Sequence, residues 1–482
     1  MAILTGLEPN RVFRYFEAIC GIPHGSYHTK QISDYCVRFA TEHGLRYIQD
    51  EAHNIILFHP GTPGYEQSAP VILQGHLDMV CEREPGCAID FEKDGLSLRL
   101  EDGYISADGT TLGGDDGIAV AYALAILDSD DIPHPPLEVI LTTDEEVGML
   151  GAAALDCSPL QSRTMINLDS EDEGLLLVSC AGGLQADCHI PVARKPVSGQ
   201  AATVTLAGLT GGHSGAEIDK GRANANQLMG RLLNELSKAV DFHLVSVEGG
   251  LKDNAIPREA KAALVISPGS RAALRDAVSH WQAVFSGEYD TTDPGLTLTA
   301  EFGELGTAAA MDGRSQRNVI AALVNMPVGI QRMSTDIPGL VQTSLNPGIL
   351  TTRSEEVTLI FSVRSSAKTE KEALYSRLEN LMALFGGSVT RHGDYPAWEY
   401  RRTSPLRDLM VRVFEQQYGR KPEVQAIHAG LECGLFSGKL EGLDCVSIGP
   451  DMDDIHTTKE RLNAESVRRT WDYLLEVLRQ LK

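Results

Sequence analysis

Residues 139–148 read VILTTDEEVG, a short apolar run that stops at three consecutive acids. The run is rich in β-branched residues and follows a Pro-Pro pair, so we expect an interior strand of a covered sheet. Ligands of open α/β sheets bind beyond the carboxyl ends of such strands. For Asp144, Glu145 and Glu146 taken alone, a solvated surface turn is still the better explanation. Their meaning therefore depends on whether the rest of the chain supplies partners for these carboxylates.

Two further apolar runs are followed by the same kinds of residue. His76 and Asp78 come after residues 71–73, and Asp169 comes directly after residues 164–168. A His-x-Asp pair on its own is more often a structural hydrogen-bonded pair. Acids and an imidazole gathered at one sheet edge, however, need positive charge at neutral pH, and a pair of divalent metal ions supplies it most directly. The recurrence at three strand ends therefore predicts a metal site.

A glycine pair in front of a buried helix adds another acid to this set. Gly113 and Gly114 precede Asp115 and Asp116, and the apolar run 118–127 follows. Capping of the helix would account for one aspartate. Two in succession, after glycines that let the backbone approach another group closely, are more than capping requires. Asp115 therefore joins the candidate ligands.

Composition limits the classes of function. The 482 residues exceed what one core usually holds, so we expect two domains. The net charge of −24 argues against binding to nucleic acid or to an anionic membrane surface. The N-terminus lacks the pattern of a signal peptide, and no apolar run reaches the roughly 20 residues of a membrane span. We expect a cytoplasmic protein whose nine cysteines, which form no CxxC pair, are reduced thiols.

The pattern of the chain changes at about residue 184. Before that point helices alternate with short buried strands, whereas beyond it hairpin-like strands and helices predict an α+β insertion. Residues 391–398 are the expected return linker, after which the α/β pattern resumes. The sequence therefore predicts a catalytic, metal-binding domain of residues 1–183 and 397–482, and an inserted lid domain of residues 184–396.

Together the motifs resemble the di-zinc exopeptidase family that includes aminoacylases, tripeptidases and carnosinases. The matching segments span essentially the whole chain, and jointly they are highly specific. The resemblance implies an α/β fold, with a mixed central sheet flanked by helices in the catalytic domain and an inserted α+β lid. The segments are GHLD (75–78), GGDDG (113–117), TDEEVG (143–148), NLD (167–169), GGHSG (211–215) and IHT (455–457).

Within this family the resemblance implies two metal ions, with zinc expected and cobalt or manganese as alternatives. Asp115 would bridge the two ions. His76 and Asp169 would bind one of them, and Glu146 and His456 the other. Two imidazoles and three carboxylates suit zinc, which takes both kinds of ligand and leaves a position for water.

The same resemblance implies the roles of three other residues. Asp78 would orient the ligand His76, and Glu145 would be the general base that moves a proton from the attacking water to the leaving amine. His213, from the lid, would steady the tetrahedral oxyanion, in this family often across a dimer interface. A homodimer formed through the lid domain is therefore expected.

The resemblance also implies that the substrate is an unblocked dipeptide. Asn254 and Arg364 would bind its polar end, and Arg364 would pair with its free carboxylate. Chain length, lid size and the segments 253–258 and 428–434 are most similar to the bacterial branch of the family that hydrolyses Xaa-His (carnosine-like) dipeptides. Relatives commonly carry Asn or Lys after the bridging aspartate. Asp116 stands there in this chain, and would alter metal affinity or face solvent.

Two alternatives remain open at this point. A tripeptidase or an N-acyl amino acid deacylase could be built on the same scaffold. A non-catalytic metal-binding protein is the alternative from another class, and the intact Glu145 speaks against it.

Overall fold

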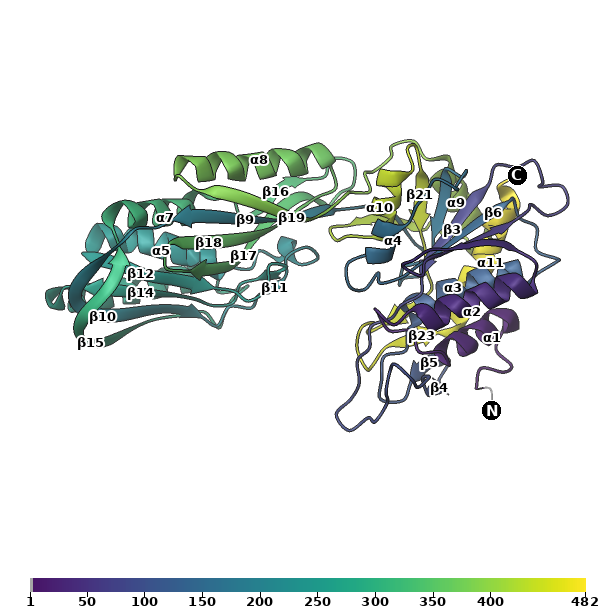
Figure 1. Cartoon of the computed structure of the whole chain (residues 1–482), viewed down its shortest axis with the longest axis horizontal. Helices are drawn as coiled ribbons and strands as arrows, with labels where there is room; N and C mark the ends of the chain where they lie inside the picture. The colour runs from purple at the N-terminus through teal and green to yellow at the C-terminus, as the bar shows by residue number, and fades with distance from the viewer. Residues whose placement is uncertain (1–2) are drawn as a thin grey trace. The chain divides into compact units, whose positions relative to one another are not determined.

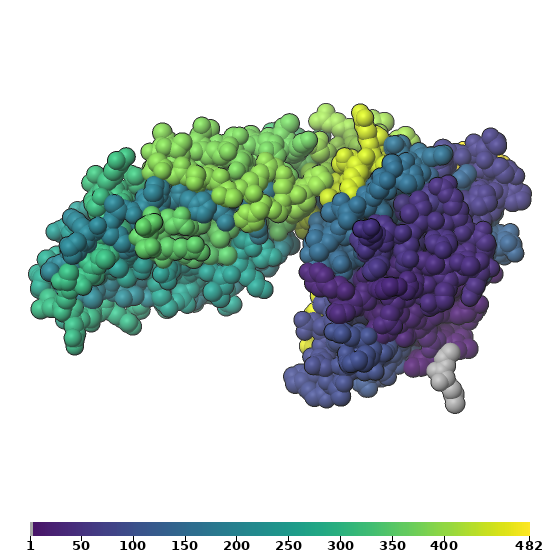
Figure 2. All heavy atoms as spheres, viewed as in Figure 1, coloured from purple at the N-terminus to yellow at the C-terminus, as the bar shows by residue number. Residues whose placement is uncertain are grey.

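The computed structural model describes residues 3–482, which divide into two compact units. The first unit runs from the start of the described chain to Cys180 and takes in Tyr400–Ala426 and Leu431–Lys482. The second comprises Ala181–Glu399 and Ile427–Gly430, and the predicted lid of residues 184–396 falls inside it. In Figure 2 the first unit combines purple and yellow atoms from both ends of the chain, whereas the second is teal and green.

A mixed eight-stranded sheet forms the centre of the first unit (Figure 1), as the sequence predicts. Its order is β1-β2-β6-β3-β7-β21-β8-β20. The four consecutive strands β6, β3, β7 and β21 are parallel to one another, so their carboxyl ends meet at one edge of the sheet. The strands are β1 (Arg46–Gln49), β2 (Ile55–His59), β3 (Val71–His76), β6 (Leu137–Thr142), β7 (Thr164–Asn167), β8 (Leu175–Cys180), β20 (Glu423–Ile427) and β21 (Asp444–Ser447).

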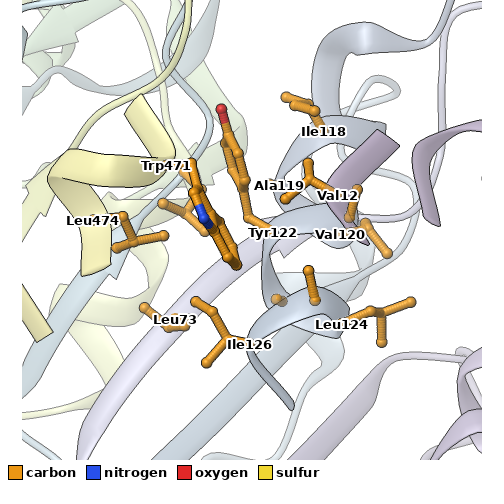
Figure 3. Close-up of a cluster of buried hydrophobic side chains, with 14 of the residues drawn as sticks. Val12, Leu73, Ile118, Ala119, Val120, Tyr122, Leu124, Ile126, Trp471 and Leu474 are labelled. Carbon is orange, nitrogen blue, oxygen red and sulfur yellow. The ribbon is translucent and has the colours of Figure 1, made fainter. Parts of the chain in front are cut away.

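Helix α3 (Gly114–Leu127) lies in the core of this unit and is buried along its whole length. Its apolar residues leave no polar face, which is typical of a fully enclosed helix. Tyr122 of α3 stacks on Trp471 with ring centroids 5.9 Å apart (Figure 3). The Tyr122 hydroxyl donates to the carbonyl oxygen of Val467 at 2.9 Å. The other helices are α1 (Asn10–Cys20), α2 (Lys30–Glu42), α4 (Leu150–Ala154), α9 (Pro405–Tyr418), α10 (Glu432–Lys439) and α11 (Ala464–Gln480).

A small four-stranded sheet of order β22-β23-β5-β4 completes the first unit. It brings the segment after the last strand of the large sheet next to the segment before α3. Its strands are β22 (Met452–Asp453), β23 (Arg461–Asn463), β5 (Tyr104–Ala107) and β4 (Leu98–Glu101).

The second unit is an antiparallel sheet with four helices, in agreement with the predicted α+β insertion. The order is β15-β10-β14-β12-β17-β18-β9-β19, with β16 paired to β17, and a separate pair joins β11 to β13. The strands are β9 (Gly182–Pro191), β10 (Arg194–Ala207), β11 (Gly212–His213), β12 (Phe242–Gly249), β13 (Ala255–Ile256), β14 (Ala260–Ile266), β15 (Thr297–Met311), β16 (Gly329–Met333), β17 (Val341–Thr352), β18 (Glu356–Ser365) and β19 (Ser388–Tyr395). The helices are α5 (Ala225–Ala239), α6 (Arg271–Glu288), α7 (Gly313–Asn325) and α8 (Lys368–Leu384).

The return linker expected at residues 391–398 is wrong for its first half. Residues up to Tyr395 belong to β19, which pairs with β9 through Arg391 and Ala186. The glycine that suggested a linker lies where the register shifts between His392 and Tyr395, and edge strands tolerate such irregularities.

Within residues 3–482, no helix combines the length and the apolar character needed to cross a membrane. The nine cysteines are all free thiols, and Cys81 is the exposed one.

Candidate metal centre

The predicted site residues of the first unit follow the carboxyl ends of its parallel strands. His76 is the last residue of β3 and pairs in register with Thr142, the last residue of β6. Glu145 and Glu146 come three and four residues after this point, in the turn that leads to α4. Asp169 lies two residues beyond the end of β7, the other neighbour of β3. The parallel register therefore delivers these side chains to one edge.

Asp115 lies between two histidines at the start of α3. Its Oδ1 atom is 3.1 Å from Nε2 of His76, and its Oδ2 atom is 3.1 Å from Nε2 of His456. The same His456 nitrogen lies 3.0 Å from Oε1 of Glu146, and Oδ1 of Asp169 lies 3.8 Å from Nε2 of His76. The structure thus brings all five predicted ligands together, with one oxygen of Asp115 facing each imidazole.

The chemistry of this donor set fits divalent metal ions. Ligand atoms of Asp115, Glu146 and His456 lie within 4.8 Å of one another. The same holds for two groups around His76, one with Asp169 and Asp116 and one with Glu146 and Glu145. Burial raises the pKa of Asp169 well above its usual value, and the neighbouring carboxylates add to the rise. Buried acids in such a cluster must take up protons or find cations. Cations bound among these side chains would supply that compensation.

The two histidines and Asp115 favour each other's charged forms. Hydrogen bonds to Asp115 and Glu146 raise the pKa of His456 to about 10. Burial alone would lower the pKa of His76, but its contacts with Asp115 and Asp78 raise it well above the usual value. Burial opposes ionisation of Asp115, yet the two imidazoles hold the pKa of its carboxyl below the ordinary range. A metal ion would therefore displace protons from both histidines.

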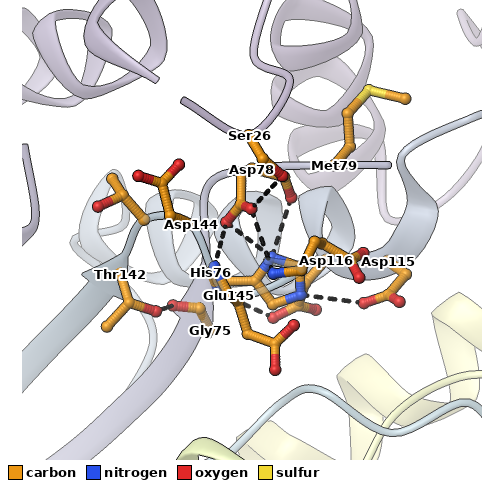
Figure 4. Close-up of polar contacts among 12 residues, drawn as sticks. Ser26, Gly75, His76, Asp78, Met79, Asp115, Asp116, Thr142, Asp144 and Glu145 are labelled. Carbon is orange, nitrogen blue, oxygen red and sulfur yellow. Dashed lines mark hydrogen bonds and ion pairs between the residues drawn. The ribbon is translucent and has the colours of Figure 1, made fainter. Parts of the chain in front are cut away.

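Asp78 connects His76 to the acidic turn (Figure 4). Its Oδ1 atom accepts from the backbone N–H of Glu145 at 2.9 Å, and its Oδ2 atom lies 3.3 Å from the backbone nitrogen of Glu146. Ser26 Oγ donates to Oδ2 at 2.8 Å. Nδ1 of His76 lies 2.9 Å from the carbonyl oxygen of Asp78 and 3.5 Å from its Oδ1, so Nε2 faces the cluster. Asp78 therefore fixes both the imidazole ring and the backbone that carries the two glutamates.

The three acids of residues 144–146 differ in their surroundings. Burial raises the pKa of Glu145 to about 8, and the nearby acids, Glu432 foremost, add to the rise. Asp144, to which the sequence assigned no role, has a positive φ of 54° and accepts from the backbone N–H of Tyr27 at 2.6 Å. Asp144 therefore ties the acidic turn to the loop between α1 and α2 instead of pointing into the cluster.

Asp116 is fully buried, so the alternative that it faces solvent is wrong. Its Oδ2 atom accepts from the backbone N–H of His76 at 3.1 Å. A side chain at Gly75 would place its Cβ only 2.5 Å from that oxygen, which explains the glycine before His76. Asp116 therefore holds the end of β3, which carries His76.

Sequence reasoning missed one further buried acid, Glu432. It is fully buried at the start of α10, and its Oε2 atom accepts from Gln74 Nε2 at 2.5 Å and Thr142 Oγ1 at 2.6 Å. These contacts join the ends of β3 and β6 beneath the candidate ligands. No periodicity or spacing in the sequence indicated this residue, although it stands in one of the segments that carry the family resemblance.

Three predicted site residues belong to the second unit, where β11 and β13 place His213 beside Ala255, the residue after Asn254. The backbone N–H groups of Gly215 and Ala216 donate to Nδ1 of His213 at 3.2 and 3.0 Å. Burial lowers its pKa, so the ring is neutral and carries its proton on Nε2.

Arg364 lies close to His213 on the same side of the second unit. A Cβ at Gly215 would be 3.0 Å from Cε1 of His213 and 3.2 Å from Nε of Arg364. Arg364 is 9% exposed and donates to the hydroxyl of Tyr395 at 3.1 Å. Asn254 is exposed, and its backbone carbonyl accepts from the N–H of Ser214 at 2.8 Å. The second unit thus presents a neutral imidazole N–H and a guanidinium next to each other.

Comparisons with known proteins identify a matching family and similar proteins over nearly the whole chain. The profile of peptidase family M20/M25/M40 matches residues 72–480. The cytosol non-specific dipeptidase of Escherichia coli (strain K12) is 37% identical over 483 residues, which cover 100% of this chain and 99% of the relative. The crystal structure of aminoacylhistidine dipeptidase from Vibrio alginolyticus superposes with a TM-score of 0.92 at 35% identity, over 98% of this chain and 97% of that one.

A more distant structure shares the fold alone. The aminopeptidase PepT of Bacillus cereus superposes with a TM-score of 0.57 at 17% identity, over 98% of this chain and 99% of that one.

Proposed function

Since this chain belongs to peptidase family M20/M25/M40, we propose that it is a metal-dependent dipeptidase. The observation that carries the proposal is the position of Asp115, whose two carboxylate oxygens each lie 3.1 Å from a different histidine. Such a carboxylate suits a bridge between two cations. Glu145, close to this cluster but outside the set of five ligands, completes the arrangement.

The proposed ligands are those expected from the sequence. Asp115 would bridge the two ions, His76 and Asp169 would hold one of them, and Glu146 and His456 would hold the other. Zinc is the expected metal, because imidazole and carboxylate together suit it, with cobalt and manganese as alternatives. Two bound ions would polarise the scissile carbonyl and lower the pKa of the attacking water.

The remaining steps belong to side chains of this chain. Glu145 takes a proton from the attacking water and returns it to the leaving amine. Asp78 keeps Glu145 in place through the backbone N–H that it accepts. His213 donates a hydrogen bond from its Nε2–H group to the developing oxyanion, which a neutral imidazole protonated on that nitrogen can do.

Substrate recognition is proposed for Arg364 and Asn254. The guanidinium of Arg364 pairs with the free carboxylate of the dipeptide, because planar donors match carboxylate geometry. Asn254 contacts the polar backbone of the substrate. The two closely similar relatives bear the names of a non-specific dipeptidase and an aminoacylhistidine dipeptidase, so we propose that Xaa-His dipeptides are among several that are hydrolysed.

A homodimer formed through the second unit, and a cytoplasmic location, complete the proposal. The name of the Escherichia coli relative supports the location. The dimer rests on the family resemblance, and His213 would act in its own subunit or in the other. Sedimentation analysis of the purified protein measures the subunit number directly, and a monomer at every concentration would contradict a dimer.

A substrate panel tests the proposed activity. Purified protein loaded with zinc, cobalt or manganese is assayed against free dipeptides with and without C-terminal His, against tripeptides and against N-acyl amino acids. Free dipeptides should show the highest kcat/KM. Preference for N-acyl compounds would identify a deacylase, and preference for tripeptides a tripeptidase. No hydrolysis of any of these substrates would support the non-catalytic alternative.

A further inference from the structure

The carboxylate of Glu460 is buried against the backbone that leads into α3. The residue is 3% exposed, and both of its oxygens face main-chain nitrogens. Oε2 lies 2.7 Å from the nitrogen of Leu112 and 3.2 Å from that of Gly113, and Oε1 lies 2.8 Å from the nitrogen of Gly114 and 3.4 Å from that of Asp115. One side chain thus accepts from four consecutive backbone N–H groups, the last of them that of Asp115.

The glycine pair before Asp115 makes this approach possible. Gly113 has a positive φ of 67°, a conformation that favours glycine, and turns the chain so that successive N–H groups converge. A Cβ at Gly114 would be 3.2 Å from Oε1 of Glu460. The close approach that the sequence suggested at these glycines is therefore made by Glu460.

Glu460 also takes the place of a helix cap. The residue at the cap position of α3, Gly113, offers no side-chain hydrogen bond, and Asp115 and Asp116 have non-helical dihedral angles. The first N–H groups of a helix need acceptors, and its N-terminus favours negative charge. The carboxylate that meets both needs comes from a residue 346 positions away from Gly114.

The same residue closes the turn that carries His456. The backbone N–H of Glu460 donates to the carbonyl oxygen of Thr457 at 3.1 Å, and Thr457 Oγ1 donates to the carbonyl oxygen of Asp454 at 2.7 Å. This turn connects β22 to β23. Glu460 therefore joins the two segments that bring Asp115 and His456 face to face.

We propose that Glu460 is a positioning residue for the metal centre. It holds the backbone of Asp115 at the distance from His456 that lets one carboxylate serve two cations. This inference rests on the metal centre of the proposed function, but it assigns to Glu460 a role that the family resemblance did not supply. Residues that fix ligands in this way typically change metal affinity about 10- to 100-fold when they are replaced.

The test is the metal affinity of Glu460→Gln. The amide has the same shape, but it offers one acceptor oxygen and turns an NH2 group toward backbone donors. Zinc dissociation constants are measured by competition with a chromogenic chelator, and Tm is measured on the metal-free protein. At least one zinc dissociation constant should rise about 10- to 100-fold. Glu460→Asp keeps the charge, so its zinc dissociation constant should rise less. If Glu460→Gln does not fold, Glu460→Asp is compared with wild type instead.

Glu138→Gln is the matched control. Glu138 is also buried and accepts from two backbone N–H groups, those of Gln161 at 2.9 Å and Ser162 at 3.1 Å, but it lies at the opposite end of β6. Glu138→Gln should lower Tm without changing the zinc affinity. An unchanged zinc affinity in Glu460→Gln, or an equal loss in Glu138→Gln, would overturn the positioning role. Wild-type protein that binds none of zinc, cobalt and manganese would instead overturn the metal centre itself.

Discussion

Oδ2 of Asp115 lies 3.1 Å from Nε2 of His456, although 341 residues separate the two in the sequence. The other oxygen of the same carboxylate faces His76. Replacement of Asp115 by Asn removes the charge and one acceptor oxygen at the centre of the cluster. Asp115→Asn should therefore lose metal from both sites and lower kcat/KM by at least about 100-fold. Elemental analysis and dipeptide hydrolysis measure the two effects, with Asp156→Asn, an exposed aspartate, as the control.

Metal loading should depend on pH in a defined direction. Hydrogen bonds to Asp115 and Glu146 raise the pKa of His456 to about 10 in the metal-free protein, so at pH 7 a metal ion must displace its proton. Zinc affinity should therefore rise with pH between 6 and 9. Titration calorimetry in buffers of different ionisation enthalpy should detect at least one proton released per chain at pH 7. Zinc binding without proton release would contradict the assignment of His456.

Asp78 should matter for catalysis although it is not a predicted ligand. Asp78→Asn weakens the contact with Nδ1 of His76 and replaces one of the oxygens that accept from the backbone of Glu145 and Glu146. The expected loss is about 10- to 100-fold in kcat or in zinc affinity. Ser26→Ala, which removes a single donor to Asp78, should cost much less. Equal activities of Asp78→Asn and wild type would refute the orienting role.

The second unit should lose stability in acid because of His428. Burial lowers the pKa of this histidine to about 3, well under the value of about 6.5 in an unfolded chain. Between these values the unfolded chain binds the additional proton. The stabilisation of the folded state by neutral His428 is thus complete above pH 6.5 and is lost as the pH falls toward 3.

In His428→Gln, the free energy of unfolding measured with urea should change less with pH between 6 and 4 than in wild type. The two slopes should differ by at most about 1.4 kcal/mol per pH unit. His280→Gln, at an exposed position on α6, is the control and should leave the slope unchanged. A slope that is the same in His428→Gln as in wild type would contradict the assignment.

Local patterns were enough to predict the strands that carry the site. The runs before His76, Glu145 and Asp169 are apolar and short, and parallel strands bring their ends to one edge. The resemblance supplied His456 and the roles of individual ligands, which spacing alone leaves open. The segment after residue 391 shows the limit, because its glycine is equally compatible with a linker and with an irregular edge strand.

Long-range contacts of single buried acids could not be predicted. The sequence left open whether Asp116 alters metal affinity or faces solvent. The structure shows that it is buried and that it accepts a hydrogen bond from the backbone of His76. Glu432 contacts Gln74, and Glu460 contacts Leu112; the two residues of each pair are more than 340 positions apart in the sequence. No periodic pattern encodes such pairs. Gly113 and Gly114 indicated a close approach, but not which residue makes it.

The central claim is that Glu145 moves the proton in a metal-dependent peptide hydrolysis. The direct measurement is kcat for a free dipeptide with Glu145→Gln, alongside zinc content determined on the same sample. The variant should retain both metal ions and a KM near that of wild type, while kcat falls by about 10²- to 10⁴-fold. A fully metal-loaded variant that hydrolyses the dipeptide as fast as wild type would contradict the account.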